Sequence, residues 1–218
     1  MTHLRRENAP KRWPIKRKGS AYVVKMDSNG LPVLIALRDV LKIANKRSEI
    51  KKAIHKKEIL ICGKIVNNEK KSIKLLDTLT INPLNKNYRM ILTKQGKFNF
   101  QEIKENEKDY KIEKIINKKI LKGKKIQLNL SDGRNFLSDM KCNVNDSVLI
   151  NLKNNKIEKC LHMKEGAKVL IISGKHIGEQ AVIKKIENKL KMVDIESHQK
   201  NARVLIKQIM VIEWKKKI

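Results

Sequence analysis

The sequence predicts a mixed α+β protein made of four small parts. These are a basic N-terminal extension, a small module of two helices and a hairpin, a central small β domain and a C-terminal small β-barrel. Apolar residues recur at helical spacing only between about residues 32 and 54, and from about residue 84 the apolar period becomes two. Glycine-containing turns then separate short, evenly spaced strands, which is typical of small barrels. The expected boundaries of the four parts are 1–30, 31–83, 84–163 and 164–218.

The composition indicates a polyanionic partner. The 218 residues include 51 Lys and Arg against 22 Asp and Glu, which gives a formal net charge of +29. A compact state with this much like charge repels itself, and a polyanion relieves that repulsion. Biased codon usage would enrich Lys, but it would enrich Glu and Asp as well. Because these acidic residues are far fewer than Lys and Arg, codon usage does not explain the positive charge. The 40% of apolar residues suffices for cores and excludes wholesale disorder.

Several protein classes are disfavoured. No stretch approaches the roughly 20 apolar residues of a membrane span, and the basic N-terminus leads into no apolar region of a secretory signal. We therefore expect a cytoplasmic protein with no membrane partner. The patterns GxxxxGK[ST] and Gly-x-Ser-x-Gly are absent. No pair of carboxylates lies in an apolar context with a base, so we expect no enzyme, no cofactor and no small-molecule substrate.

The cysteines and histidines do not predict a structural metal. Three cysteines at wide spacings form no CxxC pair, and five histidines are scattered. The thiols are typical of small apolar side chains in a reducing cytosol. Cys160 and His162 share one face of an expected strand, so a metal pair there is a minor alternative.

Residues 1–30 carry a dense block of positive charge. Pro10 and Pro14 break any helix in this segment, and only Trp13 offers much apolar area. Such a block predicts a solvated, mobile arm that becomes ordered on a phosphate backbone. Removal of residues 1–18 should then weaken RNA binding without changing thermal unfolding. The candidate RNA contacts in the arm are Arg5, Arg6, Lys11, Arg12, Lys16, Arg17 and Lys18.

Two helices are expected next. Pro32 is well placed in the first turn of a helix whose apolar face includes Leu34, Leu37 and Leu41. A second helix should begin near Ser48 as its N-cap, and its unpaired N–H groups would form an anion site. The opposite faces are basic, which is common for a merely solvated surface but also suits RNA. The candidate contacts are Arg38, Lys42, Lys46, Arg47, Lys51 and Lys52.

Short strands should fill the remaining chain. Residues 58–66 predict a hairpin that turns at Gly63-Lys64, and 75–81 predict a returning strand. Strands follow at 88–93, 98–103, 112–120, 126–130, 148–152 and 157–163, and then at 167–172, 181–186, 190–195 and 209–214. Lys64 is a further candidate RNA contact.

Two turns and two tryptophans concern function. Asp132 and Gly133 form a common turn signal, so their role should be structural, whereas Arg134 is a candidate RNA contact. Gly174 and Gly178 bracket Lys175-His176, which suits either RNA contact or a plain hairpin turn. Trp13 and Trp214 could stack on bases or anchor the fold.

Three stretches resemble one known family in the order in which that family carries them. PVLIALRDVLKIANKRSEIKKAIHKKEILICGKIVNN resembles the RNA-binding module of the bacterial small-subunit protein S-four. KGKKIQLNLSDGRN is similar to the central region of the archaeal and eukaryotic S-four-e ribosomal protein family, and EGAKVLIISGKHIGEQAVIKKIE resembles its KOW motif. With HLRRENAPKRWPIKRK at the front, the resemblance covers nearly the whole chain. The WPI and the lack of a long basic tail after Trp214 resemble archaeal members.

The resemblance implies an S-four-like RNA-binding module at 31–83 and a KOW-type, SH3-like barrel at 164–218. It also implies a ribonucleoprotein role in translation, with small-subunit rRNA and neighbouring small-subunit ribosomal proteins as partners. The alternatives are an RNA-modifying enzyme that docks through the same module and a free KOW-type regulator. The chain departs from the KOW pattern at Ser173 and Ala181, where the family often has glycine. Both substitutions are small, so we expect the turn to be kept.

Overall fold

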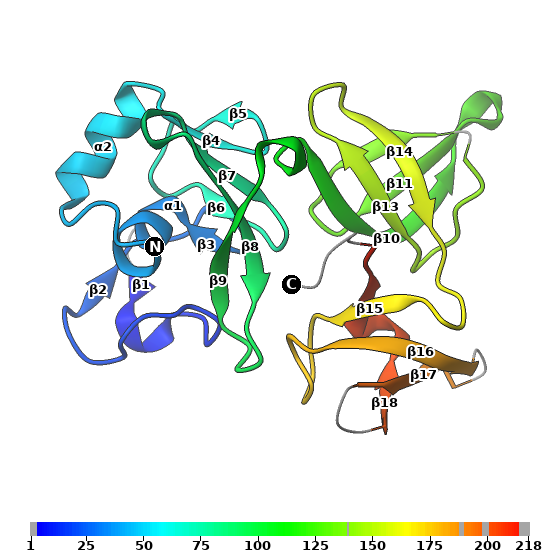
Figure 1. The fold of residues 1–218 in the computed structure, drawn as a ribbon. Coiled ribbons are helices and arrows are strands. Elements are labelled where there is room, and N and C mark those ends of the chain that lie inside the picture. Colours follow the sequence, from blue (N-terminus) through cyan, green and yellow to red (C-terminus); the bar gives the residue numbers. More distant parts are fainter. Residues whose placement is uncertain (1–3, 139, 188–189, 198–200, 214–218) are drawn as a thin grey trace. The chain divides into compact units, whose positions relative to one another are not determined.

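The computed structural model describes residues 4–138, 140–187, 190–197 and 201–213. The chain divides into two compact units, Met1–Asp109 and Tyr110–Ile218, coloured blue to green and green to red in Figure 1. Strands dominate both units, and the helices of the described residues are short. The mixed α+β class is therefore confirmed.

The helices of the first unit pack their apolar sides inward. Helix α1 (Val33–Ile35) continues into the π-helical turn η2 (Ala36–Val40), and α2 (Arg47–His55) follows after a short connection. Every residue from Val33 to Leu37 is buried, as are Ile50 and Ile54. The 3₁₀ turns of this unit are η1 (Arg6–Asn8), η3 (Asn82–Leu84) and η4 (Glu105–Glu107).

Both helices differ from the prediction in detail. The first ends early because Lys42 has a φ of +53°, which a right-handed helix cannot contain. Pro32 lies just before the helix, in strand β3, rather than in its first turn. The second helix begins at Arg47, so Ser48 lies within its first turn and is not the N-cap.

The strands of the first unit form two small ladders and one five-stranded sheet, all antiparallel. The ladders pair β1 (Leu4–Arg5) with β2 (Tyr22–Val23) and β3 (Leu31–Pro32) with β6 (Ser72–Ile73). The sheet has the order β5-β4-β7-β8-β9, from β4 (Ile59–Ile61), β5 (Lys64–Ile65), β7 (Thr78–Ile81), β8 (Lys86–Leu92) and β9 (Phe98–Ile103). The β4–β5 turn lies at Cys62 and Gly63, with φ of +50° and +74°, one residue earlier than predicted.

The pairing of β7 with β8 moves one predicted boundary. The two strands run in register from Thr78 opposite Arg89 to Ile81 opposite Lys86, so the boundary expected between residues 83 and 84 lies inside one sheet. The change of apolar period at that point therefore marks no domain boundary, because the strands of this sheet begin at Ile59 and continue through β7 into β8. The division between compact units comes after Asp109.

The second unit begins with a five-stranded sheet of order β12-β11-β10-β13-β14. Its members are β10 (Tyr110–Ile120), β11 (Ile126–Leu130), β12 (Asn135–Leu137), β13 (Ser147–Asn151) and β14 (Lys156–Leu161), and the 3₁₀ turn η5 (Lys122–Lys124) follows β10. The first half of β10 pairs with β13 and the second half with β11, with an irregularity between Ile115 and Asn117. Its core contains Ile115, Leu128, Leu130, Phe136, Cys142, Val148 and Ile150.

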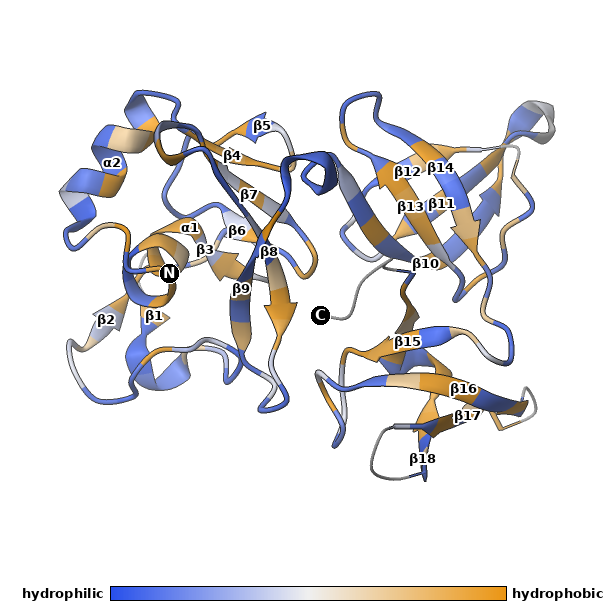
Figure 2. Ribbon diagram, viewed as in Figure 1, coloured by the Kyte–Doolittle hydropathy of each residue, from blue (hydrophilic) through white to orange (hydrophobic). Residues whose placement is uncertain are grey.

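A second five-stranded sheet, of order β18-β17-β16-β15-β19, completes this unit. Its strands are β15 (Lys168–Ile171), β16 (Gln180–Glu187), β17 (Met192–Glu196), β18 (Asn201–Leu205) and β19 (Ile209–Val211), and the 3₁₀ turn η6 (Ile206–Gln208) precedes β19. The sequence analysis missed β18, and Trp214 lies outside the described residues. Figure 2 shows apolar residues alternating along the strands of both sheets, whereas α2 in the first unit is largely hydrophilic. Among the described residues, no helix is long and apolar enough to cross a membrane.

Candidate nucleic-acid interface

The N-terminal segment is packed against the first unit through Trp13. The indole is 1% exposed, and its Nε1–H donates to the Gly30 carbonyl oxygen at 2.8 Å. The backbone N–H of Phe98, in β9, donates to the Arg12 carbonyl oxygen at 2.9 Å. The expectation of a mobile arm is therefore wrong for the described part, because one large aromatic side chain and a backbone contact dock the segment.

Two of the predicted RNA contacts hold this segment together instead. Arg6 donates to the carbonyl oxygens of Lys16 and Ser20 and to the Ser20 hydroxyl at 2.7–2.9 Å, while Arg17 donates to the Ala9 carbonyl oxygen at 2.7 Å. Carbonyl groups do not neutralise a guanidinium, so the positive charge of both side chains persists. Their donors, however, are already directed at the protein.

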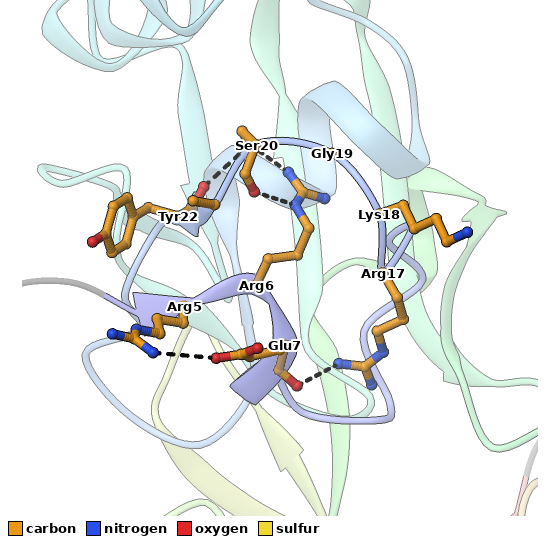
Figure 3. A pocket seen from close by; sticks show the side chains of 9 residues that line it. Arg5, Arg6, Glu7, Arg17, Lys18, Gly19, Ser20 and Tyr22 are labelled. Carbon is orange, nitrogen blue, oxygen red and sulfur yellow. Dashed lines mark hydrogen bonds and ion pairs between the residues drawn. The ribbon is translucent and has the colours of Figure 1, made fainter.

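The same segment encloses a basic hollow of about 490 Å³ (Figure 3). Arg5, Arg6, Arg17 and Lys18 line it, and Glu7 is the one acidic side chain of the lining. Glu7 forms an exposed ion pair with Arg5 at 3.6 Å. The lining is therefore electropositive, with four cations against one carboxylate, although the donors of Arg6 and Arg17 are used within the protein. Lys11 and Lys16 are exposed outside it.

Acidic neighbours occupy several cations of the two-helix region. Arg38 forms a bidentate pair with Asp39 at 2.9 and 3.1 Å, and Arg47 pairs with Glu69. The N-terminus of α2 is also occupied, since Glu49 accepts from the N–H groups of Asn45 and Lys46 at 2.9 and 3.2 Å. These two bonds hold the pKa of Glu49 below its usual value. A carboxylate of the chain itself therefore lies at the start of the helix where the anion site was expected.

The lysines around α2 remain available. Each is exposed, and the described residues provide no carboxylate within ion-pair distance of them. Lys51 and Lys52 lie in α2, which holds them at a fixed separation, and phosphates are a main contact of proteins with double-helical RNA. The lysines in this group are Lys42, Lys46, Lys51 and Lys52, with Lys64 exposed on the neighbouring hairpin.

Arg134 belongs to a buried ionic cluster in the central sheet. Its Nε donates to Asp132 Oδ2 at 2.6 Å, and that carboxylate also accepts from the fully buried Lys111 at 3.1 Å. Lys111 contacts Glu113 at 2.6 Å. Burial raises the pKa of Asp132, but Lys111 and Arg134 outweigh this effect and leave that pKa below its usual value. Asp132 and Gly133 form the expected turn, in which Gly133 has a φ of +88°.

Lys114 is a second buried lysine that sequence analysis missed. It lies on β10, and its Nζ donates to the carbonyl oxygens of Ile206 and Ile209 at 2.7 and 2.8 Å. Burial lowers its pKa to about 8. The lysine thus joins the central sheet to the last sheet and does not face a ligand. Its burial could have been predicted from the sequence only by its position among the apolar residues of this strand.

The glycines of the C-terminal turn have the predicted conformation. Gly174 and Gly178 have φ of +96° and +82°, and Gly178 N–H donates to the Ile171 carbonyl oxygen at 2.8 Å. Lys175 is exposed, whereas His176 lies 3.4 Å from Glu179. The geometry suits a tight turn that presents one lysine.

Comparison with known proteins identifies the relationship. The model of ribosomal family S4e, the S-four-e family, matches residues 84–157, and the RS4NT domain model matches residues 2–28. The small ribosomal subunit protein eS4 of Methanocella arvoryzae is 37% identical over 191 residues, which cover 85% of this chain and 81% of that protein. The eS4 protein of Methanosphaera stadtmanae is 31% identical over 220 residues, covering 96% and 91%.

A solved structure agrees with these matches. The crystal structure of the 30S ribosomal protein S4e from Thermoplasma acidophilum aligns with a TM-score of 0.75 at 26% identity, covering 87% of this chain and 97% of that one. The matched segments include both the basic N-terminal segment and the central sheet with its Asp-Gly turn. The chain therefore belongs to the S4e family of ribosomal proteins, in its archaeal form.

Proposed function

We propose that this protein is a structural constituent of the small ribosomal subunit in the cytoplasm. It binds small-subunit rRNA through its basic surfaces, contacts neighbouring small-subunit ribosomal proteins, and supports subunit assembly and translation. Family membership favours this role over an RNA-modifying enzyme or a free regulator. The observation that carries the RNA-binding part is the set of exposed lysines on and beside α2 that have no carboxylate partner within the described residues.

We also propose which kind of module each part of the chain forms. Residues 31–83 would act as an S-four-like RNA-binding module, supported by the succession of α1, α2 and the β4–β5 hairpin. Residues 164–218 would act as a KOW-type, SH3-like barrel, supported by a four-strand meander whose first strand also pairs with β19. Of residues 84–163, strands β10 to β14 would form the central β domain, whereas β8 and β9 complete the sheet of the first unit.

The proposed contacts follow from the exposure and charge of each side chain. Those with no carboxylate within ion-pair distance in the described structure should contribute most, and these are Lys11, Lys16, Lys18, Lys42, Lys46, Lys51, Lys52, Lys64 and Lys175. Arg5, Arg6 and Arg17 add charge around the N-terminal hollow, and Arg12 adds charge elsewhere on the same segment. Arg38, Arg47 and Arg134 should contribute less, because they form ion pairs with acidic side chains, and so should His176, which lies beside Glu179.

Two pairs of lysines provide a matched test. Lys51→Gln with Lys52→Gln removes two unpaired cations, whereas Lys159→Gln with Lys184→Gln removes two exposed lysines that pair with Glu213 and Glu196 at 2.6 and 3.2 Å. Both double variants change the net charge equally. Affinity for small-subunit rRNA is measured between low and high salt. The first variant should flatten the log–log salt slope by about 1.4–1.8, at 0.7–0.9 for each lost phosphate contact.

The second variant should keep the slope of the unaltered protein. Equal slopes for both variants would show that only net charge matters and would contradict contact through α2. Co-sedimentation with small subunits in a sucrose gradient tests the ribosomal role itself, since a free regulator would remain near the top.

A further inference from the structure

Three potential metal ligands lie around one point beside strands β13 and β14. Asp146 directly precedes β13, Cys160 lies on β14 and His162 follows that strand, and their ligand atoms all lie within 4.8 Å of one another. Cys160 Sγ is 3.9 Å from both Asp146 Oδ2 and His162 Nδ1, and the latter two atoms are 2.9 Å apart. The pairing of Val148 with Cys160 brings the three residues together.

Cys142 lies near this cluster but is not one of the three ligands. It is fully buried in the core of the central sheet, and Cys160 packs against that core. Cys160 is therefore held at the border of a packed core, with its thiol directed at Asp146 and His162.

The distances fit a tetrahedral ion of the zinc type. With zinc bonds of about 2.3 Å to sulfur and 2.0–2.2 Å to nitrogen or oxygen, neighbouring ligand atoms lie about 3.3–3.8 Å apart. The distances from Cys160 Sγ exceed that range slightly, and the Asp146–His162 distance is somewhat shorter. Shifts of well under one ångström would bring these atoms into place.

The surroundings of the ligands also suit a bound ion. Asp146 is 5% exposed and is held by the backbone N–H groups of Asn143 and Met163, each at 2.9 Å. Such second contacts orient metal-ligating carboxylates. His162 is 39% exposed in its side chain, which leaves a route from solvent.

We propose that Asp146, Cys160 and His162 bind one zinc-type divalent ion, with a water molecule in the fourth position of a tetrahedral site. One thiolate and one imidazole favour such an ion over magnesium or calcium. The ion would fasten Asp146, directly before β13, to the end of β14. The site is independent of the proposed RNA binding.

The rival interpretation needs no metal. Asp146 would then accept hydrogen bonds from His162 and two backbone N–H groups solely to order the loop. Cys142 and Cys160 would be ordinary buried thiols.

The test uses the full chain, purified with a non-thiol reductant and freed of metal by a chelator. Zinc chloride is titrated, and cobalt chloride serves as the spectroscopic probe. We expect one equivalent of either ion, tetrahedral visible bands and a thiolate-to-cobalt charge-transfer band. Cys160→Ser and His162→Gln should each weaken zinc binding by more than about 100-fold, beyond the effect of losing an outer contact.

Cys62→Ser and His55→Gln are the matched controls, because both residues lie outside the cluster, and they should bind zinc like the unaltered chain. His162→Gln changes an exposed ligand and should fold, so its result does not depend on the stability of a core variant. Zinc uptake that is absent, or equal in the ligand and control variants, would overturn the proposal. So would a cobalt spectrum without thiolate charge transfer, or a Cys142–Cys160 disulfide in a protein that takes up no zinc.

Discussion

Lys114 should make the stability of the second unit rise with pH. Its folded pKa is about 8, against 10.5 for an ordinary lysine, because burial disfavours the charged form. Between these values the unfolded chain binds more protons than the folded chain, so the free energy of unfolding increases as the pH rises. A difference of 2.5 units corresponds to at most about 3 kcal/mol.

The perturbation is Lys114→Met, which keeps a similar volume and removes the titrating amine. Urea unfolding of the full chain is followed by circular dichroism from pH 7 to 10.5, and peptide-resolved hydrogen exchange assigns the transition of the second unit. Subtraction of the variant's curve removes the titration of all other groups. We expect the free energy of unfolding of the unaltered chain to gain about 3 kcal/mol relative to the variant across this range.

The outcome at neutral pH has a second component. The variant leaves the Ile206 and Ile209 carbonyl oxygens without their Nζ donor, which costs about 1–3 kcal/mol each, while it also removes the desolvation of the ammonium. These effects oppose each other, so the pH dependence is the sharper measurement. Parallel curves that differ by less than about 1 kcal/mol in their change with pH would refute the reasoning.

Three further predictions concern folding. Trp13→Ala should destabilise the first unit by about 3–5 kcal/mol in urea unfolding, and Trp13→Phe by less; an unchanged midpoint would mean that the N-terminal segment is not docked. Asp132→Asn should cost about 3–5 kcal/mol because it leaves Lys111 with one buried partner fewer, and a neutral effect by calorimetry would contradict that ion pair. Gly174→Ala should cost at least about 1 kcal/mol, since its φ is +96° and a Cβ would lie 3.1 Å from Gln208; Gly123→Ala, with a positive φ but no atom within 4 Å, is the control and should cost less.

Local signals in the sequence predicted most of the strands. The hairpins around Gly63 and Gly96 and the turn at Gly133 follow from short-range backbone preferences, and the structure confirms all three positive φ values. Helix boundaries were predicted less accurately. The first helix ends before Lys42, which adopts a left-handed conformation, and a lysine does not predict that conformation. The strand β18 was not predicted, because apolar and polar residues alternate only weakly along this part of the chain.

The partners of charged residues were the least predictable feature. Composition indicated that the chain is basic, but it did not show that Arg6 and Arg17 bind backbone carbonyls or that Arg134 faces Asp132. Lys114 donates to carbonyl oxygens 92 and 95 residues away in the sequence. The spacing of apolar residues does not indicate contacts between residues so far apart. The indole of Trp13 likewise donates to the Gly30 carbonyl oxygen, 17 residues further along the chain, and no local pattern indicates that contact.

The contact of Lys114 also bears on the order in which the chain is completed during synthesis. The central sheet is translated well before Ile206 and Ile209 exist, so on a nascent chain the Lys114 ammonium has no acceptor from the last sheet. Water must satisfy it until Ile206 and Ile209 have emerged from the ribosome. The second unit can therefore reach its final packing only after that point, and until then this edge of the central sheet remains hydrated.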